Sequence, residues 1–185
     1  MTLLIVGLAL FLGIHSVRMV PGLRPLFVSA IGAGGYKLLY TLLSVIGLAL
    51  IIYGKIQAHP TEILWYPPEW SRTLAFVAIP LGLVLIIAAQ TPSHIRKFLR
   101  HPMLIGITLW GAVHLAANGD LASTILFASF LIFSVLDIAL VEMSGRYQAK
   151  EPVAVKFDVM VVAVGLILYG LIFYFHGWIA GVPLV

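Results

Sequence analysis

Residues 121–143 read LASTILFASFLIFSVLDIALVEM, an apolar run in which the only charged side chains are Asp137 and Glu142. About 20 mostly apolar residues are needed to cross a hydrocarbon core about 30 Å thick, so this run predicts a membrane-spanning helix. Lipid leaves the backbone no other way to satisfy its hydrogen bonds, so we expect a helix in each similar run. The predicted spans are residues 2–20, 35–54, 71–90, 101–117, 121–143 and 158–180. The sequence therefore predicts an all-α integral membrane bundle of six transmembrane helices, with residues 1–185 as a single polytopic membrane domain.

Composition supports this class. Of the 185 residues, 62% are hydrophobic and 10% are charged, whereas a soluble domain carries about 25% charged residues. This excludes a water-soluble globule, a disordered chain and a protein that reads nucleic acid. The chain has no cysteine, which excludes disulfides, thiolate metal sites, cysteine nucleophiles and covalently attached c-type haem.

The basic residues predict how the chain is oriented. Nine of the eleven Lys and Arg follow the first, third and fifth spans, and only Lys55 and Arg72 lie on the opposite side. The nine are Arg18, Arg24, Lys37, Arg96, Lys97, Arg100, Arg146, Lys150 and Lys156. The positive-inside rule then places the nine in the cytoplasm and both termini outside. The predicted outer side carries aromatic residues typical of a membrane interface, namely Trp65, Tyr66, Trp70, Tyr174 and Trp178.

Prolines and one short segment refine the spans. Residues 24–31 are too short to cross a membrane, and we expect them to lie along the inner interface. Pro102 suits the first turn of the fourth span, because its missing N–H is harmless there. Pro80 lies inside the third span and is expected to kink it.

Three ionisable residues are predicted to lie inside the membrane, where such groups usually face the bundle interior: His15, His114 and Asp137. The imidazole of His15 suits an axial ligand to haem iron, or else a buried ring bonded to a neighbouring carbonyl or to Ser16. For Asp137 we favour an ion pair with Arg18 or Arg100 over a proton-relay carboxylate.

Helical spacing places His114 on one face with five neighbours: Ile107, Trp110, Gly111, Ala117 and Asn118. Small residues make this face thin, so it admits either a flat ligand or another helix, and both interpretations stay open. The sequence Asn118–Gly119–Asp120 predicts a turn and an N-cap for the next helix. His101 points elsewhere around its helix, and we expect an anion contact together with Arg100, or a capping role.

Motifs of soluble enzymes are absent from the sequence: there is no phosphate-binding glycine loop, no G-x-S-x-G elbow, no H-E-x-x-H pair and no EF-hand loop. The strongest motifs are instead LRHPML at residues 99–104, Leu109–Trp110 and HLAANGDLAS at residues 114–123. Together with LGIHS at 12–16, LYTLLS at 39–44 and LWYPP at 64–68, they cover nearly the whole chain. In these motifs the chain resembles the NnrU family of bacterial membrane proteins.

The resemblance implies an inner-membrane protein associated with denitrification, in gene sets for nitrite and nitric oxide reduction. It also implies distant similarity to the plastid zeta-carotene isomerase, which uses haem b for cis–trans isomerisation of a polyene. The family pattern carries two haem-ligand histidines onto His15 and His114. The plant enzyme has a cysteine one helical turn before the second histidine, whereas this chain has Gly111 there. A thiolate ligand is therefore excluded, and haem binding by imidazole is not.

We thus expect haem b, with iron held by His15 and His114, a ring slot shaped by Trp110 and Gly111, and propionates paired with Arg18 or Arg100. The expected role is redox or gas-ligand chemistry in nitrogen-oxide metabolism. One alternative is a cofactor-free scaffold that assists a partner membrane complex. Another is an isomerase or other enzyme acting on an apolar lipid such as a polyene or quinone. Within the bilayer, these readings require a gas, an apolar small molecule or a membrane protein as partner.

The depths of the histidines in the membrane bear on this pairing. At 1.5 Å per residue, His15 lies roughly 7 Å and His114 roughly 20 Å from the inner ends of their spans. Ligands of one iron need equal depth, and helix tilt removes several Å of the difference. Depth alone pairs His15 with His101, or His114 with His176.

Overall fold

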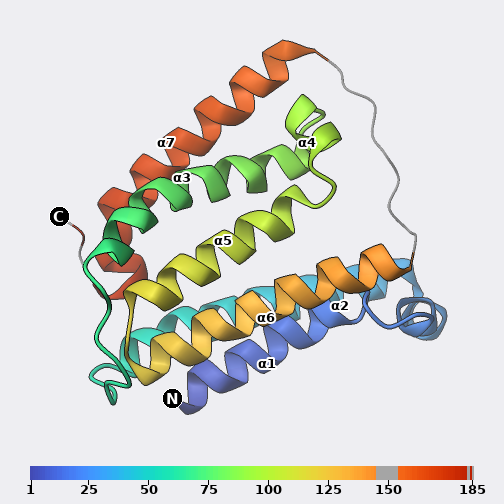
Figure 1. Cartoon of the computed structure of the whole chain (residues 1–185). Helices are drawn as coiled ribbons and strands as arrows, with labels where there is room; N and C mark the ends of the chain where they lie inside the picture. The colour runs from blue at the N-terminus through green and yellow to red at the C-terminus, as the bar shows by residue number, and fades with distance from the viewer. Residues whose placement is uncertain (145–153, 183, 185) are drawn as a thin grey trace. The chain divides into compact units, whose positions relative to one another are not determined.

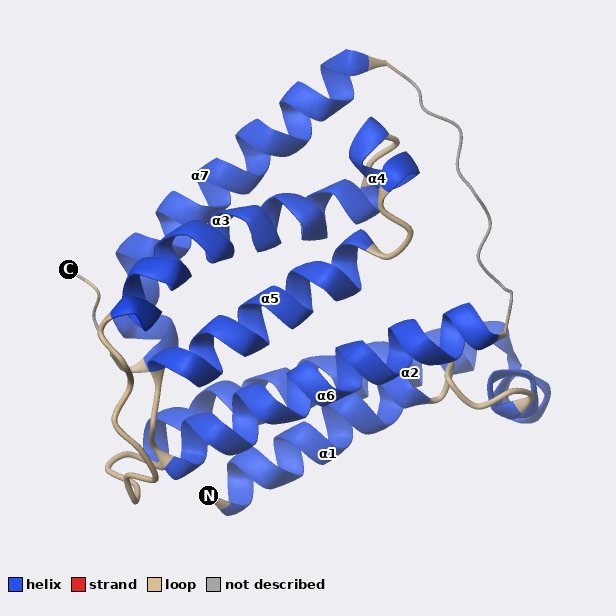
Figure 2. Ribbon diagram, in the orientation of Figure 1, coloured by secondary structure: helices blue, strands red, loops and turns tan. Residues whose placement is uncertain are grey.

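The computed structural model describes residues 1–144, 154–182 and 184, and in these residues the secondary structure is helical apart from one isolated β-bridge. The helices, blue in Figure 2, are α1 (Thr2–Ser16), α2 (Leu23–Gln57), α3 (Trp70–Gln90), α4 (His94–Phe98), α5 (Pro102–Ala117), α6 (Leu121–Met143) and α7 (Val155–Ala180). The predicted all-α class is confirmed for the described part of the chain.

Four of these helices are long and apolar enough to cross a membrane, namely α2, α3, α6 and α7. The other two apolar helices are shorter, since α1 has 15 residues and α5 has 16. At 1.5 Å per residue they reach roughly 22 and 24 Å, less than a hydrocarbon core of about 30 Å. Four candidate spans therefore meet the length requirement where the sequence predicted six.

The first two helices differ from the predicted spans at a turn. The first span was expected to reach residue 20, but α1 ends at Ser16, and Gly22, with φ of 81°, is the N-cap residue before α2. Residues 24–31, predicted to lie apart from the second span, form the first part of α2. That helix is interrupted at Gly32, whose φ of 75° and ψ of 162° suit glycine because it has no Cβ. The predicted separation thus survives as a break within α2.

Prolines and caps explain the next boundaries. Pro102 lies in the first turn of α5, as predicted, and Pro80 lies inside α3, which continues on both sides of it. The segment between these helices was predicted to be a loop, yet it contains the short helix α4. The Ser93 side chain accepts a hydrogen bond from the Arg96 backbone N–H at 3.3 Å, which caps the start of α4.

The chain divides into two compact units, Met1–Thr61 (unit 1) and Glu62–Val185 (unit 2). Unit 1 is a hairpin of α1 and α2 in which the two backbones nearly touch. A Cβ added to Gly7 would lie 2.8 Å from the Gly47 carbonyl oxygen, and one added to Gly54 would overlap the backbone of Leu4. Gly7 lies against Gly47, whereas the earlier residue Leu4 lies against the later residue Gly54. The two helices are therefore antiparallel. Small residues allow this close packing.

Unit 2 is built on α3, which packs between α5 and α7 (Figure 1). The contacts with both neighbours again depend on glycine. A Cβ on Gly106 of α5 would lie 2.5 Å from the Gly82 carbonyl oxygen of α3, and one on Gly165 of α7 would lie 2.7 Å from the Val84 side chain. Helix α6 packs against α5 on a further face.

Loops of unit 2 gather at two ends. At the basic end, defined by residues 91–101 with the end of α6 and the start of α7, His94 bonds Asp158 and Arg100 bonds Glu142. At the aromatic end, defined by residues 62–70, 118–120 and 174–182, the Leu64 N–H donates to the Gly119 carbonyl at 2.7 Å. The sequence predicted that the loop after the third span lies on the opposite side from the loops after the second and fourth spans. The two ends of unit 2 agree with this prediction. Two of the basic residues used for orientation, Arg146 and Lys150, lie outside the described residues.

The aromatic residues predicted for the outer interface belong to unit 2. Four are strongly exposed: Tyr66 at 85%, Trp70 at 59%, Tyr174 at 71% and Trp178 at 87%. They lie before or at the start of α3 and near the end of α7, which meet at the aromatic end. Exposed aromatic rings in this position are typical of a membrane interface.

Candidate functional site

The six histidines fall into two groups according to what their ring nitrogens bind. In three of them Nδ1 bonds a backbone carbonyl, and these carbonyl-bonded histidines are His15, His114 and His176. In the other three a ring nitrogen bonds a charged side chain, pairing His59 with Lys55, His94 with Asp158 and His101 with Glu142. The first group contains both predicted iron ligands.

The carbonyl bonds fix the proton on one ring nitrogen. His15 Nδ1–H donates to the Phe11 carbonyl at 2.6 Å, and His114 Nδ1–H donates to the Trp110 carbonyl at 2.9 Å. Because a carbonyl oxygen only accepts, Nδ1 carries the proton and the lone pair of the neutral ring lies on Nε2. Histidines that ligate metals usually donate their other ring N–H in this way. The donor chemistry of both residues therefore fits an imidazole ligand of haem iron.

His15 lies between aromatic rings in unit 1. Its ring stacks on Phe11 with centroids 4.3 Å apart, and the Tyr40 ring of α2 lies at 5.0 Å. The side chain is half-buried, and Arg18, one turn later along the chain, is exposed. Of the two interpretations of His15, the carbonyl bond is observed, and its partner is Phe11. That bond places the lone pair of the neutral ring on Nε2.

His114 lies in a larger aromatic group in unit 2. The Trp110 ring is 5.2 Å from the imidazole, and the Phe127 ring of α6 is 4.7 Å from it. Trp110 in turn meets Phe127 and Phe130 edge-on at 5.0 and 5.3 Å. Trp110, which the sequence placed on the same helix face as His114, thus lies beside it in the structure.

Gly111 lies where α5 packs against α6. It is buried, and a Cβ there would lie 3.1 Å from the Phe127 carbonyl oxygen and 3.3 Å from the Leu131 Cβ. The thin face of α5 at Gly111 is therefore in contact with α6. Of the two interpretations left open for this face, the structure shows helix packing at Gly111. The consequence for the site is that Phe127 is held against His114.

The turn after α5 behaves as predicted and does more. Asp120 accepts from the Ser123 N–H at 2.9 Å, which is the expected N-cap of α6, and Asn118 Nδ2 donates to the His114 carbonyl at 2.8 Å. The Leu64 and Trp65 N–H groups both donate to the Gly119 carbonyl, at 2.7 and 3.2 Å. A Cβ on Gly119 would overlap the Trp65 carbonyl oxygen, so the contact requires glycine. Sequence reasoning missed this contact, although its partners lie in the motifs LWYPP and HLAANGDLAS.

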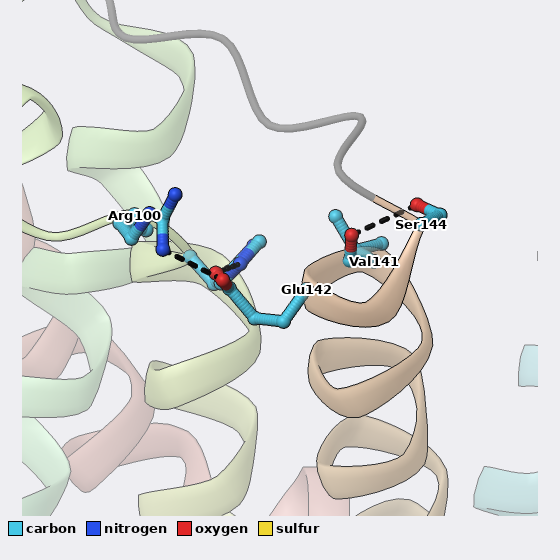
Figure 3. A network of polar contacts seen from close by, with 5 residues as sticks. Arg100, Val141, Glu142 and Ser144 are labelled. Carbon is cyan, nitrogen blue, oxygen red and sulfur yellow. Dashed lines mark hydrogen bonds and ion pairs between the residues drawn. The ribbon is translucent and has the colours of Figure 1, made fainter.

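Carboxylates organise the basic end. Arg100 Nη1 donates to Glu142 Oε2 at 2.6 Å, as the dashed line in Figure 3 marks, and His101 Nε2–H donates to the second oxygen at 2.7 Å. The predicted anion contact of His101 together with Arg100 is confirmed, with Glu142 as the anion. Its capping alternative is not observed, since the His101 side chain makes no cap hydrogen bond at the start of α5. The predicted ion pair of Asp137, which is 1% exposed, stays a prediction.

The number of side chains that could bind a metal together distinguishes a bare metal ion from haem iron. In the described residues no three His, Cys, Asp or Glu side chains come together as a group that could hold a bare metal ion. A porphyrin supplies four nitrogens of its own, so haem iron needs only one or two imidazoles. Among the predicted site residues, His114, Trp110, Gly111 and Arg100 belong to unit 2, whereas His15 and Arg18 belong to unit 1.

Apolar helices, glycine-mediated packing and an exposed aromatic end define a helical membrane protein. Within that class the chain belongs to the NnrU family, because the family model described as NnrU protein matches residues 3–184, nearly the whole chain. This confirms the family recognised from the motifs around His114. No curated protein and no solved structure matches the chain.

Proposed function

We propose that this protein crosses the bacterial inner membrane six times, with both termini in the periplasm, and binds one haem b through His15 and His114. The observation that carries the proposal is the bond from Nδ1–H to a backbone carbonyl four residues earlier, which both histidines make. This bond leaves Nε2 of each ring as the ligating nitrogen. Family membership supports the choice of these two residues, since the family resemblance implies them as ligands.

Six spans require the shorter helices α1 and α5 to cross as well. Both are apolar, with 15 and 16 residues. Local thinning of the bilayer accommodates a short span at a cost of a fraction of a kcal/mol per Å. Close packing against the longer helices α2 and α3 supports such a crossing.

Each part of the site then has a physical role. Trp110 and Phe127 place apolar ring surface beside the His114 imidazole. Gly111 keeps α6, and with it Phe127, close to that imidazole. Arg18 supplies positive charge for the haem propionates. Arg100, the other residue expected in this role, lies at the basic end and pairs with Glu142, whereas His114 lies near the opposite end of α5. The haem itself, when bound, supplies redox or gas-ligand chemistry for nitrogen-oxide metabolism.

Spectroscopy tests the proposal directly. The full chain is expressed with ample haem, purified in detergent, and examined in oxidised and reduced form. We expect a Soret band at about one haem per chain, and loss of most haem from the His15→Ala, His114→Ala double variant. His59→Ala is the matched control, because His59 is exposed and pairs with Lys55. Absence of haem from the unmodified protein, or full haem in the double variant, contradicts the proposal.

The alternatives fare differently against the packing. The scaffold hypothesis was argued from small-residue helix faces, but Gly7, Gly47, Gly106 and Gly111 are occupied by contacts inside the units. Those residues therefore offer no surface to a partner. For the polyene isomerase, Gly111 in place of the relative's cysteine removes the thiolate ligand and leaves imidazole ligation as the only route.

A further inference from the structure

We infer that His176 of α7 is a further iron-facing residue, able to take the axial position opposite His114. This inference rests on the proposed haem. The imidazoles of His114 and His176 lie in the same unit, with centroids 6.5 Å apart and planes inclined by only 17°. Neither the resemblance nor the pattern around His114 includes His176. The sequence indicated this pair only through depth.

The separation of the two rings suits coordination from opposite sides of one metal. A metal–imidazole bond is about 2 Å, and each ring nitrogen lies about 1 Å from its ring centre, so two opposed ligands have centroids about 6 Å apart. The observed 6.5 Å is close to this value.

The C-terminal turn prepares the His176 ring as a ligand. Gly181, with φ of 75°, ends α7 and reverses the chain. The following Val182 carbonyl then returns to His176, whose Nδ1–H donates to it at 2.6 Å. Nε2 therefore holds the lone pair, as in His15 and His114. All three carbonyl-bonded histidines offer the same nitrogen.

If His176 faces the iron that His114 holds, removing His15 does not open a coordination position. The iron stays six-coordinate and low-spin, because a second imidazole is already within unit 2. Only the loss of both His15 and His176 leaves one imidazole and a five-coordinate, high-spin iron. This outcome differs from that of a single His15–His114 pair, in which His15→Ala alone is sufficient.

The test uses the full chain, loaded with haem in detergent, and reads spin state by absorption and electron paramagnetic resonance. We compare the unmodified protein with His15→Ala, His176→Phe, the double variant and His59→Ala. Phenylalanine keeps the size of the ring and removes its nitrogens, which protects the fold. The expected results are a low-spin spectrum in His15→Ala, a high-spin spectrum in the double variant, and recovery of the low-spin form when free imidazole is added.

Two results overturn the inference: a high-spin iron in His15→Ala alone, or a low-spin iron in the double variant. Failure of the proposed function is distinct, since the unmodified protein would then hold no haem. His176→Phe alone identifies the ligand in the unmodified protein. If His176→Phe stays low-spin, His15 is the second ligand in the unmodified protein. If it becomes high-spin, His176 is the second ligand, in keeping with the inference.

Discussion

The two ends of unit 2 hold their helices together by different chemistry. At the basic end, charged side chains meet across helices, with Glu142 accepting from Arg100 and His101. At the aromatic end, backbone groups do this work, with the Gly119 carbonyl accepting two N–H groups from the segment before α3. Helix α5 carries a histidine towards each end, His101 at its start and His114 near its close.

This difference shows what a histidine's partner leaves available. Nε2 of His101 is engaged with Glu142, so that ring serves as a structural donor. Nε2 of His114 keeps its lone pair, because the Trp110 carbonyl binds the other nitrogen. Two histidines at opposite ends of the same helix therefore have different roles: His101 links helices through Glu142, and His114 is suited to metal ligation. Two substitutions test how far the ends differ, and a third tests the middle of unit 2.

The largest effect is expected from Gly119→Ala at the aromatic end. The new Cβ would overlap the Trp65 carbonyl oxygen, so the backbone contact must open. We expect a loss of about 3 kcal/mol in the free energy of unfolding, the upper range for overpacking. Denaturation by increasing SDS in mixed micelles, followed by circular dichroism, measures it.

Gly13→Ala is the control for this variant. A Cβ at Gly13 would meet no atom within 4 Å, and alanine is the better helix former. Its stability should be unchanged or slightly higher. Equal stability of Gly119→Ala and the unmodified protein would show that the close contact at the aromatic end is not part of the fold.

A smaller effect is expected at the basic end from Glu142→Ala. Arg100 is 57% exposed and can be hydrated, whereas His101, at 11%, loses its acceptor in a mostly buried place. We expect a loss of about 1 kcal/mol, the range for a partly exposed ion pair with one buried donor. The difference from the unmodified protein should shrink in high salt, because screening already weakens the native pair.

Glu69→Ala controls for the loss of a carboxylate, since Glu69 is exposed at the other end of unit 2. Its effect should be smaller than that of Glu142→Ala. If the two variants are equally stable at low salt, the ion pair with Arg100 contributes nothing measurable.

The smallest effect belongs to the middle of unit 2, where Thr108 Oγ1 and Ser134 Oγ lie 2.9 Å apart between α5 and α6. Thr108→Val removes this hydroxyl and keeps the shape. Hydrogen bonds between membrane helices average about 0.6 kcal/mol, so we expect a loss of that size. Thr108→Ser, which keeps the hydroxyl, should restore most of the stability, and equal losses in both variants would count against the bond.

The sequence predicted the helices better than their ends. Apolar runs located α3, α5, α6 and α7 to within a few residues, because length and hydropathy suffice to mark a helix in lipid. The end of α1 and the break at Gly32 depend on turn geometry, which periodicity does not report. The helix α4 is only five residues long, too short for hydropathy to mark, and it begins at a capping serine, Ser93.

Part of the candidate site could be predicted in the same way. Spacing along α5 placed Trp110 beside His114, because residues four apart share a helix face. The contact of His114 with His176 joins helices far apart in the chain, and only an estimate of depth pointed to it. The packing of Gly111 against Phe127 likewise depends on which helix lies alongside, and one helix's pattern cannot decide that.

Residues 62–65, a strap of chain before α3, are hydrogen-bonded to the turn at Gly119. This contact limits which changes of sequence the protein can accept. Its bonds run through main-chain atoms of Leu64, Trp65 and Leu121, the last donating to the Glu62 carbonyl at 2.9 Å. Most of these side chains can be substituted without loss of the hydrogen bonds, because the bonds are made by main-chain atoms. A one-residue insertion or deletion is not tolerated in the same way, since it would shift the register of every amide in the strap.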